Sequence, residues 1–236
     1  MDCSTCKFRR DAIYRGADVA LIRAIQDIRT GSAAFSKGQL IMADQRESRH
    51  VYTLTRGWAF SYALLRDGRR QILDYYTAGD FLTLSTLMEN GIKASVRALT
   101  DVEACCFDAP AIRTLLASKE RLVPGVFSYF GEKKAQCDAR ITSLGALKAE
   151  EAVAVLILSL VHRSAPEPGS NMQHLFPLRL ADIADAVGIT DIHAGRIIRR
   201  LEQQGAIKRQ GTDGFLVNIA TLRQVTEEVA PVLFEV

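Results

Sequence analysis

The sequence predicts an α+β fold that combines an antiparallel β-roll, one long helix and a helical C-terminal domain ending in a β-hairpin. Three observations lead to this prediction. Short apolar runs with a period of two fill residues 35–107 and are separated by glycines. A long helical pattern covers residues 123–147. Two short amphipathic helices then meet at a glycine within residues 178–208.

The overall composition fits one large or two modest globular domains. The chain has 236 residues, of which 48% are hydrophobic and 24% charged, and its formal net charge is +3. These values argue against wholesale disorder, and so small a net charge predicts no partner by itself. The acidic, polar start has no cleavable signal pattern, and the longest apolar run, residues 152–161, is too short to cross a bilayer. We therefore expect a cytoplasmic protein with no membrane partner.

The N-terminal tail, residues 1–17, is polar and contains Cys3 and Cys6. Apolar residues at helical spacing then predict a short amphipathic helix over residues 19–28. The chain has five cysteines, an odd number for a disulfide framework, and a reducing compartment favours free thiols or metal ligands.

The predicted β-roll domain covers residues 18–119. Its runs LIMA, VYTLT, AFSYALL, QILDYY and VEACCF are separated by Gly38, Gly57, Gly68, Gly79 and Gly91. Glycine permits positive φ at tight turns, where other residues would strain the backbone. Short β runs punctuated in this way are typical of an antiparallel barrel or roll.

Residues 120–147 are predicted to form a dimerisation helix, after a brief helix over residues 110–118. At about 1.5 Å per residue the long helix would measure roughly 37 Å, too long for so small a domain to bury. A narrow apolar stripe with charged flanks is typical of a coiled-coil seam. A homodimer is the simplest interpretation, and packing of the helix along its own barrel is the alternative. The stripe consists of Val126, Phe130, Cys137, Ile141 and Leu144.

The C-terminal domain, residues 148–236, begins with a predicted helix over residues 149–163 and the loop SAPEPGSN. A helix with one apolar face follows and ends at Gly188, which supplies the bend. Thr190 can then cap the next helix by accepting a hydrogen bond from its free amides. The apolar face of the first helix consists of Leu180, Ile183, Ala184 and Val187.

The second helix of this pair has an apolar stripe on one side and guanidinium groups on the other. A helix of this kind suits a DNA major groove. The alternative is an ordinary helical hairpin with a solvated basic face. After this pair, IKRQGTDGFLVNI predicts a hairpin that turns at Asp213 and Gly214, as in a winged helix-turn-helix. The stripe consists of Ala194, Ile197, Ile198 and Leu201, and the opposite side of Ile192, Arg196, Arg199 and Gln203, with Arg200 at its edge.

A glycine-punctuated β-roll, a long dimer helix and a winged helix-turn-helix, in this order, resemble the CRP/FNR superfamily of bacterial transcription regulators. The resemblance covers nearly the whole chain, and its most specific segments are ADIADAVGITDIHAGRIIRRLEQQGAI and TAGDF. It implies a cupin-like sensor roll and a homodimer that binds two-fold symmetric promoter DNA and contacts RNA polymerase. The two recognition helices of such a dimer lie roughly 34 Å apart. Because the chain has no P-loop, GxSxG or HExxH motif, we expect no enzymatic activity.

The resemblance also implies roles for single residues. Arg196 matches the arginine that reads a guanine in each half-site, since its forked donors fit O6 and N7. Thr190 falls near a DNA phosphate, and Gly195 lets the helix lie close to the duplex. Ile192 replaces the glutamate of many relatives and can touch a thymine methyl. The predicted DNA-contacting residues are Thr190, Asp191, Ile192, His193, Gly195, Arg196, Arg199 and Arg200.

His193 is assigned to packing or to a phosphate rather than to base readout. Arg179 replaces the threonine that usually caps the first helix of the pair, which leaves the start of that helix open.

A cyclic nucleotide is the first of three signals that the roll could sense. Relatives that bind one carry a glutamate for the ribose and an arginine–serine pair for the phosphate. Here Leu84 falls near the glutamate position, Ala94 and Ser95 offer no arginine, and Arg97 belongs to the following strand. A buried phosphate needs a paired cation, so this segment argues against a cyclic nucleotide. A regulator of the same fold that responds to a cyclic nucleotide or another small ligand is kept as the alternative function.

An iron–sulfur cluster, as in the oxygen-sensing FNR branch, is the second candidate signal and would make the regulator responsive to oxygen or redox state. Cys3 and Cys6 form a CxxC pair, and Cys105 matches the late cysteine of that branch. Cluster ligation takes four thiolates, and the third N-terminal cysteine of the branch is missing. The fourth ligand is therefore unknown. Cys106, Cys137 and Asp11 are candidates, although Cys106 points away from Cys105 and Cys137 lies in the dimer seam.

The third interpretation is that the cysteines form a thiol switch, bind another metal or have no signalling role. A CxxC pair can form a disulfide or half of a zinc site. Buried cysteines also serve as small hydrophobic residues. A haem or small organic ligand in the roll stays open as well.

Overall fold

The computed structural model describes residues 3, 6, 18–43, 49–82, 94–164, 174–211 and 214–226. The chain separates into two compact units. The first contains residues 1–63 and 73–133, and the second contains residues 64–72 and 134–236. This division differs from the sequence-based one, because residues 64–72 and the second part of the long helix belong with the C-terminal unit.

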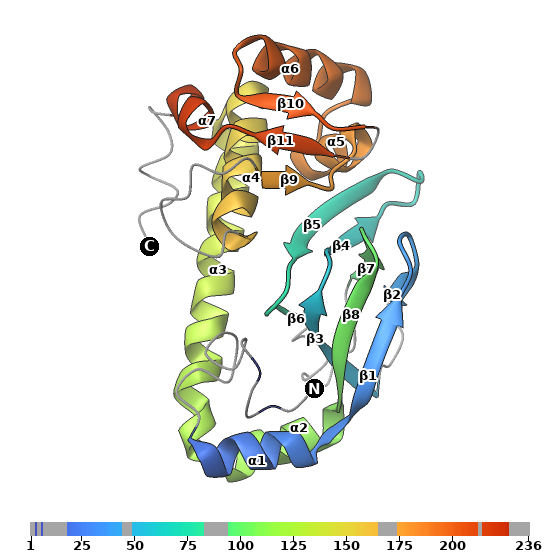
Figure 1. Cartoon of the computed structure of the whole chain (residues 1–236), viewed down its shortest axis with the longest axis vertical. Coiled ribbons are helices and arrows are strands. Elements are labelled where there is room, and N and C mark those ends of the chain that lie inside the picture. Colours follow the sequence, from blue (N-terminus) through green and yellow to red (C-terminus); the bar gives the residue numbers. More distant parts are fainter. Residues whose placement is uncertain are drawn as a thin grey trace. The chain divides into compact units, whose positions relative to one another are not determined.

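Antiparallel strands in two sheets form the roll (Figure 1). One sheet has the strand order β1-β8-β3-β6 and the other β2-β7-β4-β5. The prediction of an antiparallel roll is confirmed. Strand β1 begins earlier than residue 35 and β6 was not predicted, whereas β7 is the strand to which Arg97 was assigned. The strands are β1 (Arg29–Phe35), β2 (Leu40–Met42), β3 (His50–Arg56), β4 (Ala59–Leu64), β5 (Arg70–Tyr76), β6 (Phe81–Leu82), β7 (Ser95–Ala98) and β8 (Val102–Asp108).

Alternation along β8 places side chains in two different cores of the first unit. Val102 belongs to a cluster with residues from both sheets, including Leu54 and Val96, and Ala104 on the same face of β8 is buried as well. The next residues on the opposite face, Cys105 and Phe107, join a cluster with apolar residues of the helices. Successive residues of a strand point to opposite faces, so one strand serves both cores.

Gly57 shows why the turns of the roll need glycine. Its φ is +86°, and an added Cβ atom would lie 2.1 Å from the carbonyl oxygen of Asp101. No side chain fits there without displacing backbone. Gly38, Gly68 and Gly79 also have positive φ, as the sequence predicted, whereas Gly91 lies outside the described residues.

Helices α1 (Val19–Asp27) and α2 (Ala109–Ser118) flank the roll strands in the chain and are capped by aspartates. The Asp18 carboxylate accepts a hydrogen bond from the Leu21 amide at 2.8 Å, and Asp108 accepts one from Ala111 at 3.2 Å. These contacts satisfy amides that the first turn of a helix leaves unpaired. A short 3₁₀ segment, η4 (Glu120–Leu122), leads into the long helix α3 (Val123–Ala146).

The first half of α3 is attached to the roll by polar contacts. The Tyr129 hydroxyl donates to the Phe81 carbonyl at 3.2 Å and accepts from the Phe81 amide at 3.3 Å. Burial raises the pKa of this hydroxyl above its ordinary value, so it stays protonated. Lys133 forms ion pairs of 3.1 Å with both Asp74 and Asp80.

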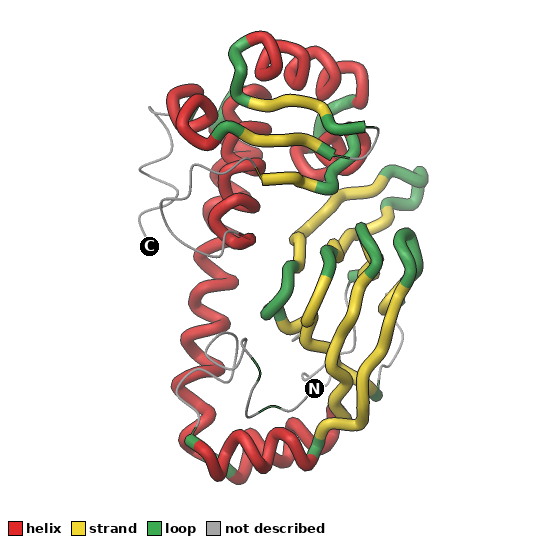
Figure 2. The backbone as a smooth tube through the Cα atoms, viewed as in Figure 1, coloured by secondary structure: helices red, strands yellow, loops and turns green. Residues whose placement is uncertain are grey.

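The second unit combines helices with a small sheet of strand order β10-β11-β9 (Figure 2). The hairpin prediction is confirmed by the antiparallel pairing of β10 and β11, whereas its turn at Asp213 lies outside the described residues. Strand β9 and helix α7 were not predicted. The elements are α4 (Ala149–Ser164), β9 (His174–Phe176), α5 (Leu180–Val187), α6 (Asp191–Gln203), β10 (Ile207–Arg209), β11 (Phe215–Val217) and α7 (Ile219–Val225). No helix in the described ranges is long and apolar enough to span a membrane.

Candidate nucleic-acid interface

Helices α5 and α6 are joined by a turn that the sequence predicted. Gly188 ends α5 in the left-handed conformation, with φ 74° and ψ 33°. Its amide and that of Ile189 donate to the Ala184 carbonyl at 2.8 and 3.1 Å. Thr190 then caps α6, since its hydroxyl accepts from the His193 amide at 3.2 Å. The bend and the cap fix the direction in which α6 leaves the turn.

The start of α5, which the sequence left open, depends on Asp182 rather than on a threonine. Helix α5 begins at Leu180, and Arg179 is its capping residue. The Asp182 carboxylate accepts from the Arg179 amide at 3.4 Å and pairs with the Arg179 guanidinium at 3.1 Å. A side chain in the first turn therefore reaches back to the cap, as in a capping box.

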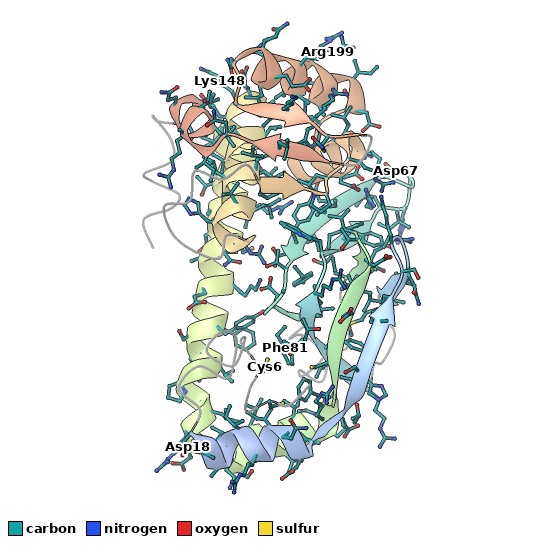
Figure 3. The ribbon with its side chains drawn as sticks, viewed as in Figure 1. Cys6, Asp18, Asp67, Phe81, Lys148 and Arg199 are labelled. Carbon is teal, nitrogen blue, oxygen red and sulfur yellow. The ribbon has the colours of Figure 1, made fainter. Side chains whose placement is uncertain are left out.

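Helix α6 has a buried face and a basic exposed face, as predicted. Its apolar stripe is buried and includes Ile198 and Leu201, which have no exposed surface. Arg196 and Arg199 are exposed, and Arg199 points outward from α6 (Figure 3). Within the described part of the chain, neither arginine forms an ion pair. Both guanidinium groups are thus available to an external anion or base.

The remaining arginine of the predicted set is occupied. Arg200 forms an ion pair with Glu150 of helix α4. Nearby, Glu202 pairs with Arg209 of the β-hairpin at 3.4 Å and also accepts from its backbone amide at 3.2 Å. Neither glutamate pairing can be predicted from the sequence, because no local pattern links residues on different elements.

The other predicted contact residues lie at or near the start of α6. Asp191, Ile192 and His193 are exposed, and 71% of Ile192 is accessible to solvent. The exposed His193 is thus accessible for the phosphate contact that the sequence analysis gave as one of its two roles. Gly195 is not required by internal packing, because an added Cβ would meet only the Leu180 side chain, at 4.0 Å.

Two family models match this chain in the order of its units. A cyclic nucleotide-binding domain model matches residues 33–119, and a Crp-like helix-turn-helix model matches residues 151–225. The chain belongs to the CRP/FNR family of transcription regulators.

Individual relatives agree with this membership. The nitrogen fixation regulation protein FixK of Bradyrhizobium diazoefficiens is 27% identical over 87% of this chain and 85% of its own length. The fumarate and nitrate reduction regulatory protein of Yersinia pestis is 24% identical over 83% of this chain and 78% of its own length. Among solved structures, FixK2 from Bradyrhizobium japonicum aligns with a TM-score of 0.72 and 22% identity, covering 82% of this chain and 96% of that protein. The structural likeness establishes the fold.

The cysteines of this CRP/FNR protein do not assemble a metal site within the described residues. Cys105 is buried, whereas Cys3 and Cys6 are half-buried in the tail. Cys3 packs against the cluster that contains Cys105. However, no three histidine, cysteine, aspartate or glutamate side chains of the described residues are grouped so that they could hold a metal ion. The thiols present therefore do not fit a four-thiolate cluster, and Asp11 lies outside the described residues.

The two other candidate thiols lie on β8 and on α3. Cys106 lies on the face of β8 opposite Cys105, and Cys137 is exposed on α3. Burial raises the pKa of the Cys106 thiol, and the neighbouring Cys105 adds to the effect.

Strand β7 follows the residues that were compared with the phosphate-binding pair of nucleotide-binding relatives, and this strand contains no free cation. Arg97 of β7 donates to the Gly38 carbonyl at 2.7 Å and to the Tyr62 hydroxyl at 3.3 Å. Its side chain is thus bound within its own roll, and Arg97 lies in a strand, as the sequence predicted. Leu84 lies outside the described residues.

One exposed face of α3 is apolar along the helix. Phe127 is 72% exposed and Ile141 62% exposed. Val126, by contrast, packs against the helix-side core of the roll and does not belong to this face, which corrects the predicted stripe. The exposed members of this face are Val123, Phe127, Phe130, Cys137, Ile141 and Leu144. They follow one another at intervals of three and four residues when Lys134, between Phe130 and Cys137, is included. We call these six residues the α3 stripe.

Proposed function

We propose that this regulator is a homodimer that binds two-fold symmetric promoter DNA through α6. The observation that carries the proposal is the exposed guanidinium of Arg196, which is unpaired within the described residues and lies opposite the buried stripe of a capped helix. Its two parallel donors fit the O6 and N7 acceptors of guanine. In this proposal, Arg199 and Thr190 contact the DNA backbone, and Ile192 contacts a thymine methyl.

The proposed dimer forms through the α3 stripe. Intervals of three and four residues keep apolar side chains on one side of a helix, which is the pattern of a two-stranded coiled coil. Exposed side chains such as Phe127 and Ile141 cost free energy in water, and pairing of two stripes removes that cost. A two-fold dimer presents two copies of α6 to two half-sites of one duplex.

The proposed partners are promoter DNA and RNA polymerase, and the proposed role involves no catalysis. These partners place the action of the protein in the cytoplasm. The thiols favour a regulator that responds to redox state. Cys3 packs against the hydrophobic cluster that contains Cys105. The backbone amide of Cys3 also donates to the Gln26 side chain at 2.8 Å. The donor set supports a thiol response rather than an iron–sulfur cluster.

Selection of bound duplexes from a random DNA pool tests the proposal. The wild-type protein should recover an inverted repeat with one guanine per half-site that depends on Arg196. The Arg196→Ala variant should lose discrimination at that guanine by about 1–3 kcal/mol. The exposed Arg23 on α1 provides the control, since Arg23→Ala should preserve the preference. An unchanged preference in Arg196→Ala would refute the assignment.

The redox form of the proposal needs a separate measurement. Protein purified without oxygen should contain no stoichiometric iron or sulfide. Its DNA affinity should change after mild thiol oxidation, and Cys105→Ser should remove the change. Stoichiometric iron and sulfide would contradict the thiol interpretation.

A further inference from the structure

Residues 64–72 form the tip of the β4–β5 hairpin and belong to the same compact unit as the helix-turn-helix. The Leu65 amide donates to the Arg69 carbonyl at 2.8 Å, and the Gly68 amide donates to the Leu65 carbonyl at 3.0 Å. At the tip itself, Arg69 pairs with Asp67 and both are exposed. The tip is therefore a closed turn with its own local ion pair.

The next residue, Arg70, points instead to helix α5. Its guanidinium donates to Asp182 at 2.8 Å and to Asp185 at 2.6 Å. The Asp182 side chain has no exposed surface, and that of Arg70 is 20% exposed. Burial opposes the charge of Arg70, but the hydrogen bonds to Asp185 and Asp182 outweigh it and raise the pKa of the guanidinium. Arg70 thus joins two carboxylates one turn apart on the first helix of the pair.

This arginine matters for charge balance. Asp182 also pairs with Arg179, so two guanidinium groups face the two carboxylates of α5. Removal of Arg70 would take away the cation that pairs with both carboxylates, while the half-exposed Arg179 pairs with Asp182. A buried carboxylate that loses its cation strongly destabilises its surroundings.

The hairpin also contacts the far end of α5. The side-chain amide of Gln71 donates to the Ala186 carbonyl at 3.2 Å. Arg140 of α3 donates to that same carbonyl at 3.2 Å and to the Ile72 carbonyl at 2.8 Å. Carbonyls in the last turn of a helix lack internal partners, and cationic donors satisfy them. Both ends of α5 are therefore fixed by contacts that involve residues 70–72.

We propose that Arg70 is a positioning residue for DNA binding, and that residues 64–72 are a control element through which the roll acts on the helix-turn-helix. Strands β4 and β5 continue from this tip into the first unit, so a rearrangement of those strands reaches Arg70 through the chain itself. Arg70 fixes the position of α5, and the position of α6 then follows because the two helices are joined by the short turn at Gly188. The inference rests on the proposed function, since its output is DNA affinity.

The test compares Arg70→Met with the matched control Arg69→Met, because Arg69 is adjacent and exposed, and its side chain pairs with Asp67 of the same turn rather than with α5. Both variants of the full chain are measured for hydrogen exchange of the α5 amides and for affinity to the selected duplex. Arg70→Met should increase α5 exchange and weaken DNA binding by at least about tenfold. Arg69→Met should change neither.

Two further variants separate positioning from general folding. Arg70→Lys keeps the positive charge but loses the forked guanidinium donors that bind both carboxylates. It should therefore bind DNA more tightly than Arg70→Met but less tightly than the wild type. Asp185→Asn leaves Arg70 paired with the buried Asp182, so it folds even if Arg70→Met does not, and it should weaken DNA binding to a smaller extent. Wild-type exchange and affinity in both Arg70→Met and Asp185→Asn, or tighter DNA binding in either, would overturn the inference. If the wild-type protein binds no DNA, the proposed function fails, while the exchange experiment still tests the contact between the hairpin and α5.

Discussion

The carboxylate of Glu150 on α4 forms an ion pair with the guanidinium of Arg200 on α6. The pair joins α4 to α6. It also occupies one of the three arginines predicted to contact DNA, whereas Arg196 and Arg199 are unpaired within the described residues. A DNA phosphate would have to compete with Glu150 for Arg200.

Glu150→Gln should release Arg200 and strengthen DNA binding. Arg200 is 62% exposed, so the loss of this ion pair should cost at most about 1 kcal/mol of stability. If Arg200 then binds a phosphate, the slope of log affinity against log salt should steepen by roughly one unit. Titrations at several salt concentrations measure this slope. An unchanged slope would mean that Glu150 does not control whether Arg200 contacts the duplex.

Gly195→Ala should separate stability from DNA binding. Alanine favours a helix over glycine by about 0.5–1 kcal/mol, and the site has room for a methyl group inside the protein. The variant should therefore unfold at a higher temperature but bind DNA more weakly, because the methyl group holds α6 away from the duplex. Gly131→Ala on α3, another position with open space, is the control and should leave DNA affinity unchanged. Undiminished binding by Gly195→Ala would show that this close approach does not occur.

Phe127→Asp should dissociate the proposed dimer. A carboxylate in the α3 stripe would have to be buried without a partner on association. Sedimentation should show a monomer, and the affinity for an inverted repeat should fall together with the dimer. Thr142→Asp places the same charge on α3 at an exposed position outside the stripe, and it should remain dimeric. A dimeric Phe127→Asp variant would place the subunit contact elsewhere.

Thiol labelling gives an independent test of the same contact. Cys137 is exposed in one subunit and belongs to the α3 stripe, so alkylation should be slow in the dimer and fast in the Phe127→Asp monomer. Cys106 should react slowly in both, because burial raises the pKa of its thiol and lowers the thiolate fraction near neutral pH. Its labelling should accelerate as the pH rises. Equal rates for Cys137 in dimer and monomer would argue against its place in the seam.

Local patterns in the sequence were sufficient to predict much of this protein. The spacing of Ile197, Ile198 and Leu201 identified the buried face of α6, and Gly188 and Thr190 identified the turn and cap. These features depend on residues within one or two helical turns, so they can be read directly from the chain. The DNA contacts assigned from them stay predictions.

Contacts between distant residues could not be predicted in this way. Arg70 and Asp182 are 112 positions apart, and nothing beside either residue marks the other. Strand β9 has three residues, too few for a recognisable period, and is a strand only because β11 pairs with it. Val126 was placed in the exposed stripe because spacing alone does not tell which edge of a helix its own domain covers.

Lys134 occupies a central position of the series that defines the α3 stripe, and its ammonium pairs with Asp138 on the same helix at 2.6 Å. An ammonium group at an inner heptad position tolerates few alternative alignments of two helices and weakens their affinity. Modest changes in protein concentration or ionic strength should therefore shift the equilibrium between monomer and dimer. Abundance in the cell would then itself set how much of this regulator is competent to occupy a promoter.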